Sequence, residues 1–406
     1  MKKPILAAGN RVMILGSAAA VILWLAALSA GPAAAQTDPW QGFMEAGSRF
    51  LQQGNLTEAE RQFRGAAAAA EAFGPEDMRL GLSLVSIGRI HLRLGRWGMA
   101  EGMFRRALAI YEKGRGPQHL DVALIANDLA ESYRVQGRYA EAEPLYLRSL
   151  AIAETALGAE HPNIAASANN LGLVYQAQGR HADAERLFRH ELAIFDKGTP
   201  DPPALARGLD NLGQSLRPQG KYAEAEAIFR RALAIRENAL GPDHIEVTVG
   251  LNQLAGLFQV QAKFADAEPL YARSLAIAEK TLGPDHPNVA TGLVNLAGLL
   301  TDAGKPASAE PLFRRALTIR EKALGPNHAE VASALDSLAG LYATQARHAE
   351  AEPLARRALA ISERALGADH PFVARALDTI VAILHATGRA AEAEPLETRA
   401  KAIRAR

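Results

Sequence analysis

The sequence predicts an all-α fold, an α-solenoid built from about nine stacked helix pairs. Turn signals recur along the chain at a nearly constant step, and apolar residues recur between them at helical spacing. Alanine is abundant and aromatic residues make up only 6% of the chain, which favours helices over sheets. Since 49% of the 406 residues are hydrophobic, the chain can bury a large core.

The first 35 residues have the pattern of a secretory signal peptide. A basic start at residues 1–11 precedes an apolar run at 18–28, and the small residues Ala33, Ala34 and Ala35 follow. We therefore expect cleavage after Ala35. The alternative is an uncleaved anchor, because the wider apolar stretch approaches the length that spans a membrane.

The remaining chain, residues 36–406, is expected to form a single solenoid outside the cytoplasm. Its composition, rich in alanine and arginine, together with the export signal predicts a bacterial envelope protein crossing the inner membrane into the periplasm. The first 35 residues hold three of the positive charges and no acid, so the net charge of +1 becomes +1 − 3 = −2 for the mature chain. A nearly neutral chain has no overall attraction for nucleic acid.

The turn signals define the repeat. Most consist of Gly followed by a basic residue, and the intervals between them are 41 or 42 residues. The nine turns lie at Gly54, Gly95, Gly137, Gly179, Gly220, Ala262, Gly304, Ala346 and Gly388. A step this constant over the whole mature chain is more specific than any local motif in the sequence.

Each repeat is interpreted as two helices. Before the turn at Gly179, apolar residues recur at i, i+4, i+7 and i+11, which marks one helix face: Ile164, Ala168, Leu171 and Tyr175. After the turn, a second face is marked by Ala184, Phe188 and Leu192. One helix pair cannot bury both faces alone, so the pairs must stack on one another.

The stretch LGPDHPNVA at residues 282–290 connects consecutive repeats. Gly283 suits a helix end, Asp285 can accept hydrogen bonds from the next helix, and Pro287 suits its first turn. One histidine per repeat follows this pattern, at His119, His161, His244, His286, His328 and His370. Residues one repeat apart cannot converge on one metal ion, so we expect a structural role and no metal site.

Two segments depart from the repeat. Residues 196–209 lack the DHP pattern and carry Pro200, Pro202 and Pro203, which make the segment stiff and extended. This irregularity either changes the pitch at mid-array or is a tolerated loop variant. The polar last helix, residues 392–406, is expected to cap the solenoid without a further domain after it.

Catalytic chemistry is not expected. The sequence has no cysteine, which excludes disulfides and thiolate catalysis, and it carries no nucleophile elbow, metalloprotease or phosphate-loop motif. Acid pairs such as Glu141 and Glu143 lie beside basic residues and indicate a solvated charged face. We therefore predict a protein that is not an enzyme and uses no cofactor.

With these residues in view, the chain resembles the tetratricopeptide repeat family, in particular the long repeats of kinesin light chains. Its signature spacing is matched by Leu171, Gly172, Tyr175, Ala184 and Phe188, with the small-residue turn at Gly179. The resemblance runs from about residue 38 to the C-terminus. It implies a right-handed superhelix whose inner surface binds peptides or proteins, whereas a motor role is not expected because the export signal replaces the family's N-terminal coiled coil.

The resemblance also implies which residues line the groove. Positions five, nine and twelve of each first helix share one helix face and are expected to point inward. Together with the neighbouring asparagines, they give the predicted peptide-binding residues Asn127, Glu131, Arg134, Asn169, Asn170, Gln176, Asn211, Gln214, Arg217, Asn252, Gln259 and Asn295. The alternative interpretation is a set of solvated polar residues.

The carboxamides are the basis of the binding hypothesis. An asparagine donates and accepts at once, so a ladder of them can hold the backbone of an extended peptide. The groove floor becomes small at Gly256, Gly298 and Gly340, so we expect peptide contacts to concentrate in the N-terminal half.

The sequence therefore predicts a non-catalytic scaffold that binds a protein or peptide. Its alternatives are a structural protein that self-associates and an accessory subunit of a separately encoded envelope enzyme. Neither nucleic acid nor cofactor is expected as a ligand, and membrane contact is expected only if the signal segment is retained.

Overall fold

The computed structural model describes residues 38–404, which divide into two compact units between Pro200 and Asp201. This part of the chain contains 18 α-helices, one short 3-10 helix and no strand, which confirms the all-α prediction. The expected signal peptide at residues 1–35 lies outside the described residues.

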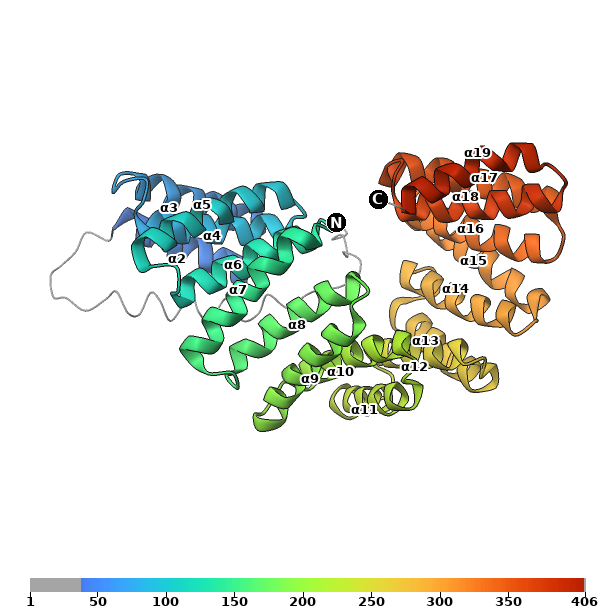
Figure 1. Ribbon diagram of the computed structural model, residues 1–406, viewed down its shortest axis with the longest axis horizontal. Coiled ribbons are helices and arrows are strands. Elements are labelled where there is room, and N and C mark those ends of the chain that lie inside the picture. The colour runs from blue at the N-terminus through green and yellow to red at the C-terminus, as the bar shows by residue number, and fades with distance from the viewer. Residues whose placement is uncertain (1–37, 405–406) are drawn as a thin grey trace. The chain divides into compact units, whose positions relative to one another are not determined.

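The first unit holds four helix pairs, stacked in chain order (Figure 1). Its first helices are α2 (Pro39–Gln52), α4 (Met78–Arg93), α6 (Leu120–Arg134) and α8 (Pro162–Ala177). Its second helices are α3 (Leu56–Glu71), α5 (Trp97–Arg115), α7 (Tyr139–Leu157) and α9 (His181–Lys197).

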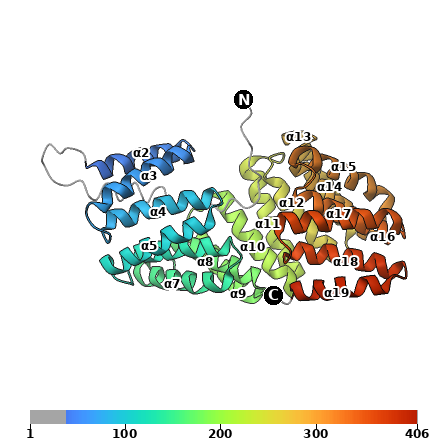
Figure 2. The same ribbon diagram turned by 90° about the horizontal axis from the view of Figure 1, so that it is seen from above.

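The second unit holds five pairs, seen from another side in Figure 2. Its first helices are α10 (Pro202–Leu216), α12 (Val247–Val260), α14 (Pro287–Asp302), α16 (Ala329–Thr344) and α18 (Pro371–Ala386). Its second helices are α11 (Tyr222–Leu240), α13 (Phe264–Leu282), α15 (Pro306–Leu324), α17 (His348–Leu366) and α19 (Ala390–Arg404), and the short helix η1 (Arg217–Gln219) follows α10.

Four of the nine described pairs are closed by a phenylalanine ring of the second helix against a glycine of the first. A Cβ added to Gly172 would lie 2.6 Å from the Phe188 ring, and Gly213 and Phe229 repeat the arrangement at 2.5 Å. Both phenylalanines are fully buried. The spacing predicted from the sequence is therefore a packing requirement, since a larger residue at the glycine would displace the ring.

The loops between pairs share one backbone geometry at six joints. Each begins with a glycine whose φ lies between 86° and 92°, a conformation that residues with a Cβ rarely adopt, at Gly116, Gly158, Gly241, Gly283, Gly325 and Gly367. Its N–H donates to a carbonyl four residues earlier, as in Gly283 to Glu279 at 3.0 Å. Three residues after this glycine comes the joint histidine.

The joint histidine, and not the preceding acid, caps the next helix. In the joint before α14, the backbone N–H of Asn288 donates to His286 Nδ1 at 3.1 Å. The expectation that Asp285 accepts this bond is therefore wrong, because Asp285 instead forms an ion pair with Lys322 at 2.7 Å. Asp285 and His286 are adjacent in the sequence and both can accept a hydrogen bond, so the sequence alone does not show which of them caps α14.

The predicted irregular segment lies at the division between the two units. Gly198 has a φ of −115°, unlike the joint glycines, and Asp201 at the start of α10 makes no side-chain capping bond. The regular joint geometry is thus absent from residues 196–209.

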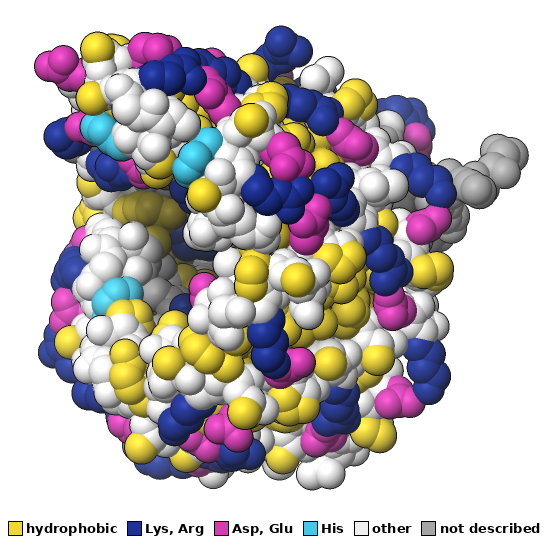
Figure 3. All heavy atoms as spheres, turned by 90° about the vertical axis from the view of Figure 1, so that its right-hand side faces the viewer, with side chains coloured by type: hydrophobic (Ala, Val, Ile, Leu, Met, Phe, Trp, Pro, Cys, Tyr) yellow, Lys and Arg dark blue, Asp and Glu magenta, His cyan; other side chains and the backbone are white. Residues whose placement is uncertain are grey.

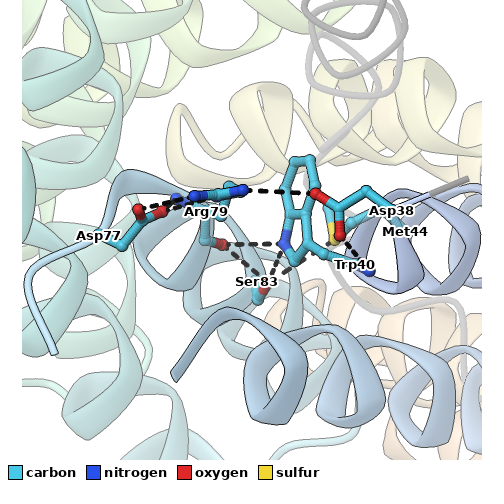
Figure 4. Close-up of polar contacts among 6 residues, drawn as sticks. All are labelled: Asp38, Trp40, Met44, Asp77, Arg79 and Ser83. Carbon is cyan, nitrogen blue, oxygen red and sulfur yellow. Dashed lines mark hydrogen bonds and ion pairs between the residues drawn. The ribbon is translucent and has the colours of Figure 1, made fainter. Parts of the chain in front are cut away.

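The described chain begins with a buried tryptophan that fixes α2 on α4. The Trp40 indole N–H donates to Ser83 Oγ at 3.0 Å and to the Arg79 carbonyl oxygen at 3.2 Å (Figure 4). Arg79 also forms ion pairs with Asp77 at 3.0 Å and with Asp38 at 3.3 Å. Because Trp40 is 4% exposed, these bonds satisfy a donor that water cannot reach.

Candidate functional site

The first helices form the inner face of each unit. In the first unit α4 contacts α6 and α6 contacts α8, and in the second unit α14 contacts α16 and α16 contacts α18. Within residues 38–404, second helices make no contact of comparable extent with one another. First helices are therefore closer together, which places them on the inner side of the local curvature.

Three asparagines on this inner face form a connected line in the first unit. Asn170 Nδ2 donates to Asn127 Oδ1 at 3.2 Å, and Asn169 Nδ2 donates to Asn170 Oδ1 at 3.4 Å. All three side chains are half-buried. The line joins α6 to α8, so the structure brings together the three predicted asparagines of the first unit, which we call the asparagine line.

Glu131 and Arg134 are occupied by each other. Arg134 donates to both carboxylate oxygens of Glu131 at 2.7 Å, and the buried Tyr146 hydroxyl donates to Glu131 Oε2 at 2.8 Å. Burial alone would lower the pKa of Arg134, but the bonds and charge of Glu131 outweigh it and raise that pKa. This bidentate pair stiffens α6 and leaves little capacity for a ligand.

In the second unit, the aspartate at the fifth position of α10 is internal. Asp210 is 4% exposed and forms an ion pair with Arg236 of α11, which is 3% exposed. Burial raises the pKa of Asp210, more than the charge of Arg236 lowers it. The same spacing recurs between Asp378 and Arg404. Asp336 at the fifth position of α16 instead bonds Arg375 and Thr379 of α18.

Asn252 takes the fifth position of α12 without such a partner. The second-helix residue at the matching position is Ala278, and Asn252 Oδ1 is buried with no hydrogen-bond partner among the described residues. The carboxamide is half-buried on the inner face.

The other predicted residues of the second unit are Gln259 and four further side chains, all of them half-buried. Gln259 donates to Asp302 at 2.6 Å and accepts from the Tyr271 hydroxyl at 3.1 Å, so it connects α12 to α13 and α14. The rest are also half-buried: Asn211, Gln214, Arg217 and Asn295. Gln176 of the first unit is also half-buried.

Two glycines at the ninth position of the first helices face open space on the inner face. A Cβ added to Gly298 or Gly340 would meet no atom within 4 Å, so both face open space. At Gly256 a Cβ would lie 3.5 Å from Arg217 Nη1, which shows that this arginine approaches α12 closely. The inner face of α14 and α16 is therefore open.

Two neighbouring helix pairs, α14–α15 and α16–α17, are joined by one set of polar bonds, which we call the tyrosine lock. The Tyr342 hydroxyl donates to Glu310 at 2.9 Å, and Arg347 donates to Glu310 at 2.6 Å with its guanidinium 4.0 Å from the Tyr342 ring. Hydrogen bonds from Arg347, Tyr342 and Arg314 lower the pKa of Glu310 to about 2. Tyr133 and Tyr175 are packed likewise under arginines at 4.3 and 3.8 Å.

The lock is incomplete between α11 and α13, and a pocket lies there. Phe258 stands in the tyrosine position without a hydroxyl, and Lys263 Nζ is 5.7 Å from its ring. Within residues 38–404, Lys263 forms no ion pair, whereas Lys305 at the matching position binds Glu268 at 2.8 Å. The pocket has a volume of about 340 Å³ and is also lined by Glu226 and Arg230.

The outer surface carries balanced charge. On the face shown in Figure 3, basic and acidic side chains alternate without a patch of one sign. Many of these charges pair across successive repeats at a separation of 37 residues, as in Lys305 with Glu268 and Arg389 with Glu352. The charges on this face are therefore largely compensated by neighbours of opposite sign.

Residues 38–404 contain neither a membrane-spanning helix nor a group of metal-binding side chains. No helix in this range is long and apolar enough to cross a membrane. No three His, Asp or Glu side chains of the same range are grouped so that they could hold a metal ion.

Comparisons with known proteins agree with the fold. The chain is 26% identical to a putative kinesin light chain of Podosopora anserina with nearly identical TPR-like repeats, with a TM-score of 0.46, over 51% of this chain and 97% of that one. It is 19% identical to a tetratricopeptide repeat protein from Parabacteroides merdae, with a TM-score of 0.53, over 74% and 98%. The quorum sensor NprR from B. thuringiensis in its apo form is 13% identical, with a TM-score of 0.61, over 89% and 98%.

A family model described as tetratricopeptide repeat matches residues 46–113, 121–197, 247–322, 289–363 and 330–406. Other models with the same description match residues 205–246 and 85–156. No curated protein matches. Such repeats typically form non-catalytic scaffolds that bind proteins. Because the matches cover more than half of the chain, the protein belongs to the tetratricopeptide repeat family.

Proposed function

We propose that this protein is a non-catalytic scaffold of the bacterial envelope that binds an extended segment of a partner protein along the inner face of its first helices. The asparagine line is the observation that carries the proposal. It presents carboxamides from two successive first helices at a half-buried surface, and the backbone of an extended segment offers matching carbonyl and amide groups.

Asn127 is the residue whose substitution tests this surface most directly. Its Oδ1 accepts the bond from Asn170, and within residues 38–404 its two N–H donors have no partner. An Asn127→Asp substitution keeps an acceptor for Asn170 and removes both donors, so the fold is retained while a bound carbonyl would lose its partner. Asn238→Asp is the matched control, because Asn238 is exposed on the second helix α11.

The experiment is capture from an envelope extract with residues 36–406, followed by mass spectrometry and an affinity titration of the captured partner. We expect the wild type and Asn238→Asp to bind alike, and Asn127→Asp to bind roughly tenfold more weakly, as for one lost hydrogen bond in a desolvated contact. Equal affinity of all three proteins would show that the asparagine line is not the binding surface.

The envelope location is proposed from residues 1–35 alone. Their basic start, apolar run and Ala33–Ala35 site are the pattern of an export signal. Fractionation of cells that express the full chain should give a periplasmic protein whose N-terminal residue is Gln36. A cytoplasmic protein that begins at Met1 would contradict this location without affecting the peptide-binding proposal.

A further inference from the structure

The six joint histidines share one hydrogen bond, which caps the next helix at five of them, whereas the His244 bond lies in the turn before α12, where the N-cap residue is Glu246. In every case the Nδ1 atom accepts from the backbone N–H two residues later, at 3.1–3.2 Å. The donors are Asp121, Asn163, Glu246, Asn288, Glu330 and Phe372. An N–H donor requires a lone pair on Nδ1, so each of these bonds exists only while the imidazole is neutral.

Protonation would remove the bond and add a second penalty. An imidazolium carries N–H on both ring nitrogens, so Nδ1 can no longer accept. Its positive charge would also lie at a helix N-terminus, where the helix dipole disfavours cations. An unfolded imidazole takes up its proton without either cost, near pH 6.5. Acid therefore favours opening of the joints over their capped form.

The groups around the joints do not offset this penalty in the second unit. Most carboxylates there are paired with cations of the following second helix, as Asp285 is with Lys322 and Glu279 with Arg315. Within residues 38–404, none comes within ion-pair distance of a joint imidazole except Asp121, whose Oδ2 lies 3.2 Å from His119 Nδ1. The Asp121 carboxylate would stabilise a protonated His119 imidazole. His119 is therefore not a member of the set.

The charged groups that face the four joints of the second unit come from the loop, from the helix it starts and from the helices on either side. They are Glu237, Asp243, Glu246, Arg273 and Lys280 at His244; Glu279, Asp285, Arg315 and Lys322 at His286; Arg320, Glu321, Glu330 and Arg357 at His328; and Glu363, Asp369, Arg375 and Arg399 at His370. Both signs are present at every joint.

We propose that these histidines make the joints of the repeat array a proton-sensitive set, in which mild acid releases the N-caps of α14, α16 and α18 together with the matching His244 bond in the turn before α12. Each released cap multiplies the opening equilibrium of its joint by about fivefold. Because neighbouring repeats stabilise each other, the effects add along the second unit. This device is independent of the proposed function, since it needs no partner.

The test uses the quadruple variant His244→Asn, His286→Asn, His328→Asn and His370→Asn in residues 36–406. Asparagine is a strong N-cap acceptor that does not titrate, so the capping bond is kept and only its pH dependence is removed. Thermal unfolding is followed at pH 7.5 and pH 5.5. We expect the wild type to lose several degrees of melting temperature between these values, and the asparagine variant to lose less than half as much.

A quadruple alanine variant and a local measurement complete the test. The alanine variant should be destabilised already at pH 7.5 and should lose little more at pH 5.5. In the wild type alone, amide exchange of Asn288 and Phe372, corrected for intrinsic pH dependence, should accelerate severalfold at pH 5.5. Equal acid losses in the wild type and the asparagine variant, or unchanged corrected exchange, would overturn the proposal.

Discussion

At the residue scale, the chemistry of a side chain depends on which repeat it occupies. His91 of α4 stands where Tyr133 and Tyr175 stand in the next two repeats. It is fully buried, and neither of its ring nitrogens has a hydrogen-bond partner among the described residues. The Glu60 carboxylate lies 3.8 Å from Nε2. The imidazole therefore fills the tyrosine position without making the tyrosine's bond.

His91 predicts a pH dependence of the first unit. Burial lowers the pKa of His91 from 6.5, Glu60 opposes this shift, and Arg64 and Arg96 add to it. Below about pH 6.5, His91 binds a proton more readily in the unfolded chain than in the folded chain. The contribution of neutral His91 to the free energy of unfolding is therefore present above this pH and is lost as the pH falls. We expect His91→Tyr to flatten this loss and to add roughly 1 kcal/mol at pH 5.5.

Urea denaturation of residues 36–406 at pH 7.5 and 5.5 measures this effect. The joint histidines are the same in both proteins, so the difference between wild type and His91→Tyr isolates His91. His385→Gln is the control, because His385 is exposed and already pairs with Glu397 at 2.6 Å. A His91→Tyr protein with the same acid loss as the wild type would contradict the assignment.

At the element scale, the polar bonds of the tyrosine lock are complete in some helix pairs and partly missing in others. Arg347 bonds Glu310 and Glu350 together while it covers the Tyr342 ring. The side chains of Phe258 and Lys263 at the matching positions cannot make these bonds, because one lacks the hydroxyl and the other lacks the guanidinium fork. Both side chains line the pocket of about 340 Å³.

Completing the lock should stabilise the second unit. In the double variant Phe258→Tyr and Lys263→Arg, the new hydroxyl and guanidinium can reach Glu226, and Asp266 stands three residues after the arginine as Glu350 does after Arg347. We expect a gain of about 1 kcal/mol, since one hydrogen bond and one partly exposed fork are added. The measurement is the urea midpoint at unchanged slope.

The single variant Lys263→Arg is its control, because the arginine without the tyrosine hydroxyl should give only part of the gain. If the double variant is no more stable than the wild type, the missing bonds do not weaken the second unit.

The sequence predicted the elements more completely than the contacts on their surface. Nine pairs follow from the period of the turn signals, and in four of them a glycine faces a phenylalanine ring. The hydrogen bond between Asn127 and Asn170 was not predicted; only the inward direction of these asparagines, which lie on the successive first helices α6 and α8, was predicted. The pairing of Glu131 with Arg134 was not, because i,i+3 spacing is compatible with a pair or with two free side chains. The role of His286 was missed because a neighbouring aspartate is a commoner cap.

At the scale of the whole molecule, stability is the sum of neighbouring contacts. Each helix packs mainly on its own partner and on the adjacent pair. The regular joint is absent at residues 196–209, and the two compact units meet at this point of the sequence. Each unit contains whole helix pairs with their own buried glycine–phenylalanine contacts.

We therefore expect each unit to fold alone. Residues 36–200 and 201–406, produced separately, should be helical by circular dichroism and should unfold cooperatively in urea, with slopes that together approach that of the full chain. The cut separates no helix from its partner, since α10 begins the second unit. A fragment that is helical but unfolds without a sigmoidal transition would show that its packing depends on the other unit.

The constant separation of the cross-repeat ion pairs has a consequence for the history of the gene. Glu268 pairs with Lys305 and Glu310 pairs with Arg347, each 37 residues on. Recombination that removed residues 269–310 would leave Glu268 at the same separation from Arg347, with an equally suitable cation opposite it. Whole repeats can thus be gained or lost by unequal crossover without breaking the pairing, so array length is a property that selection can change in single steps.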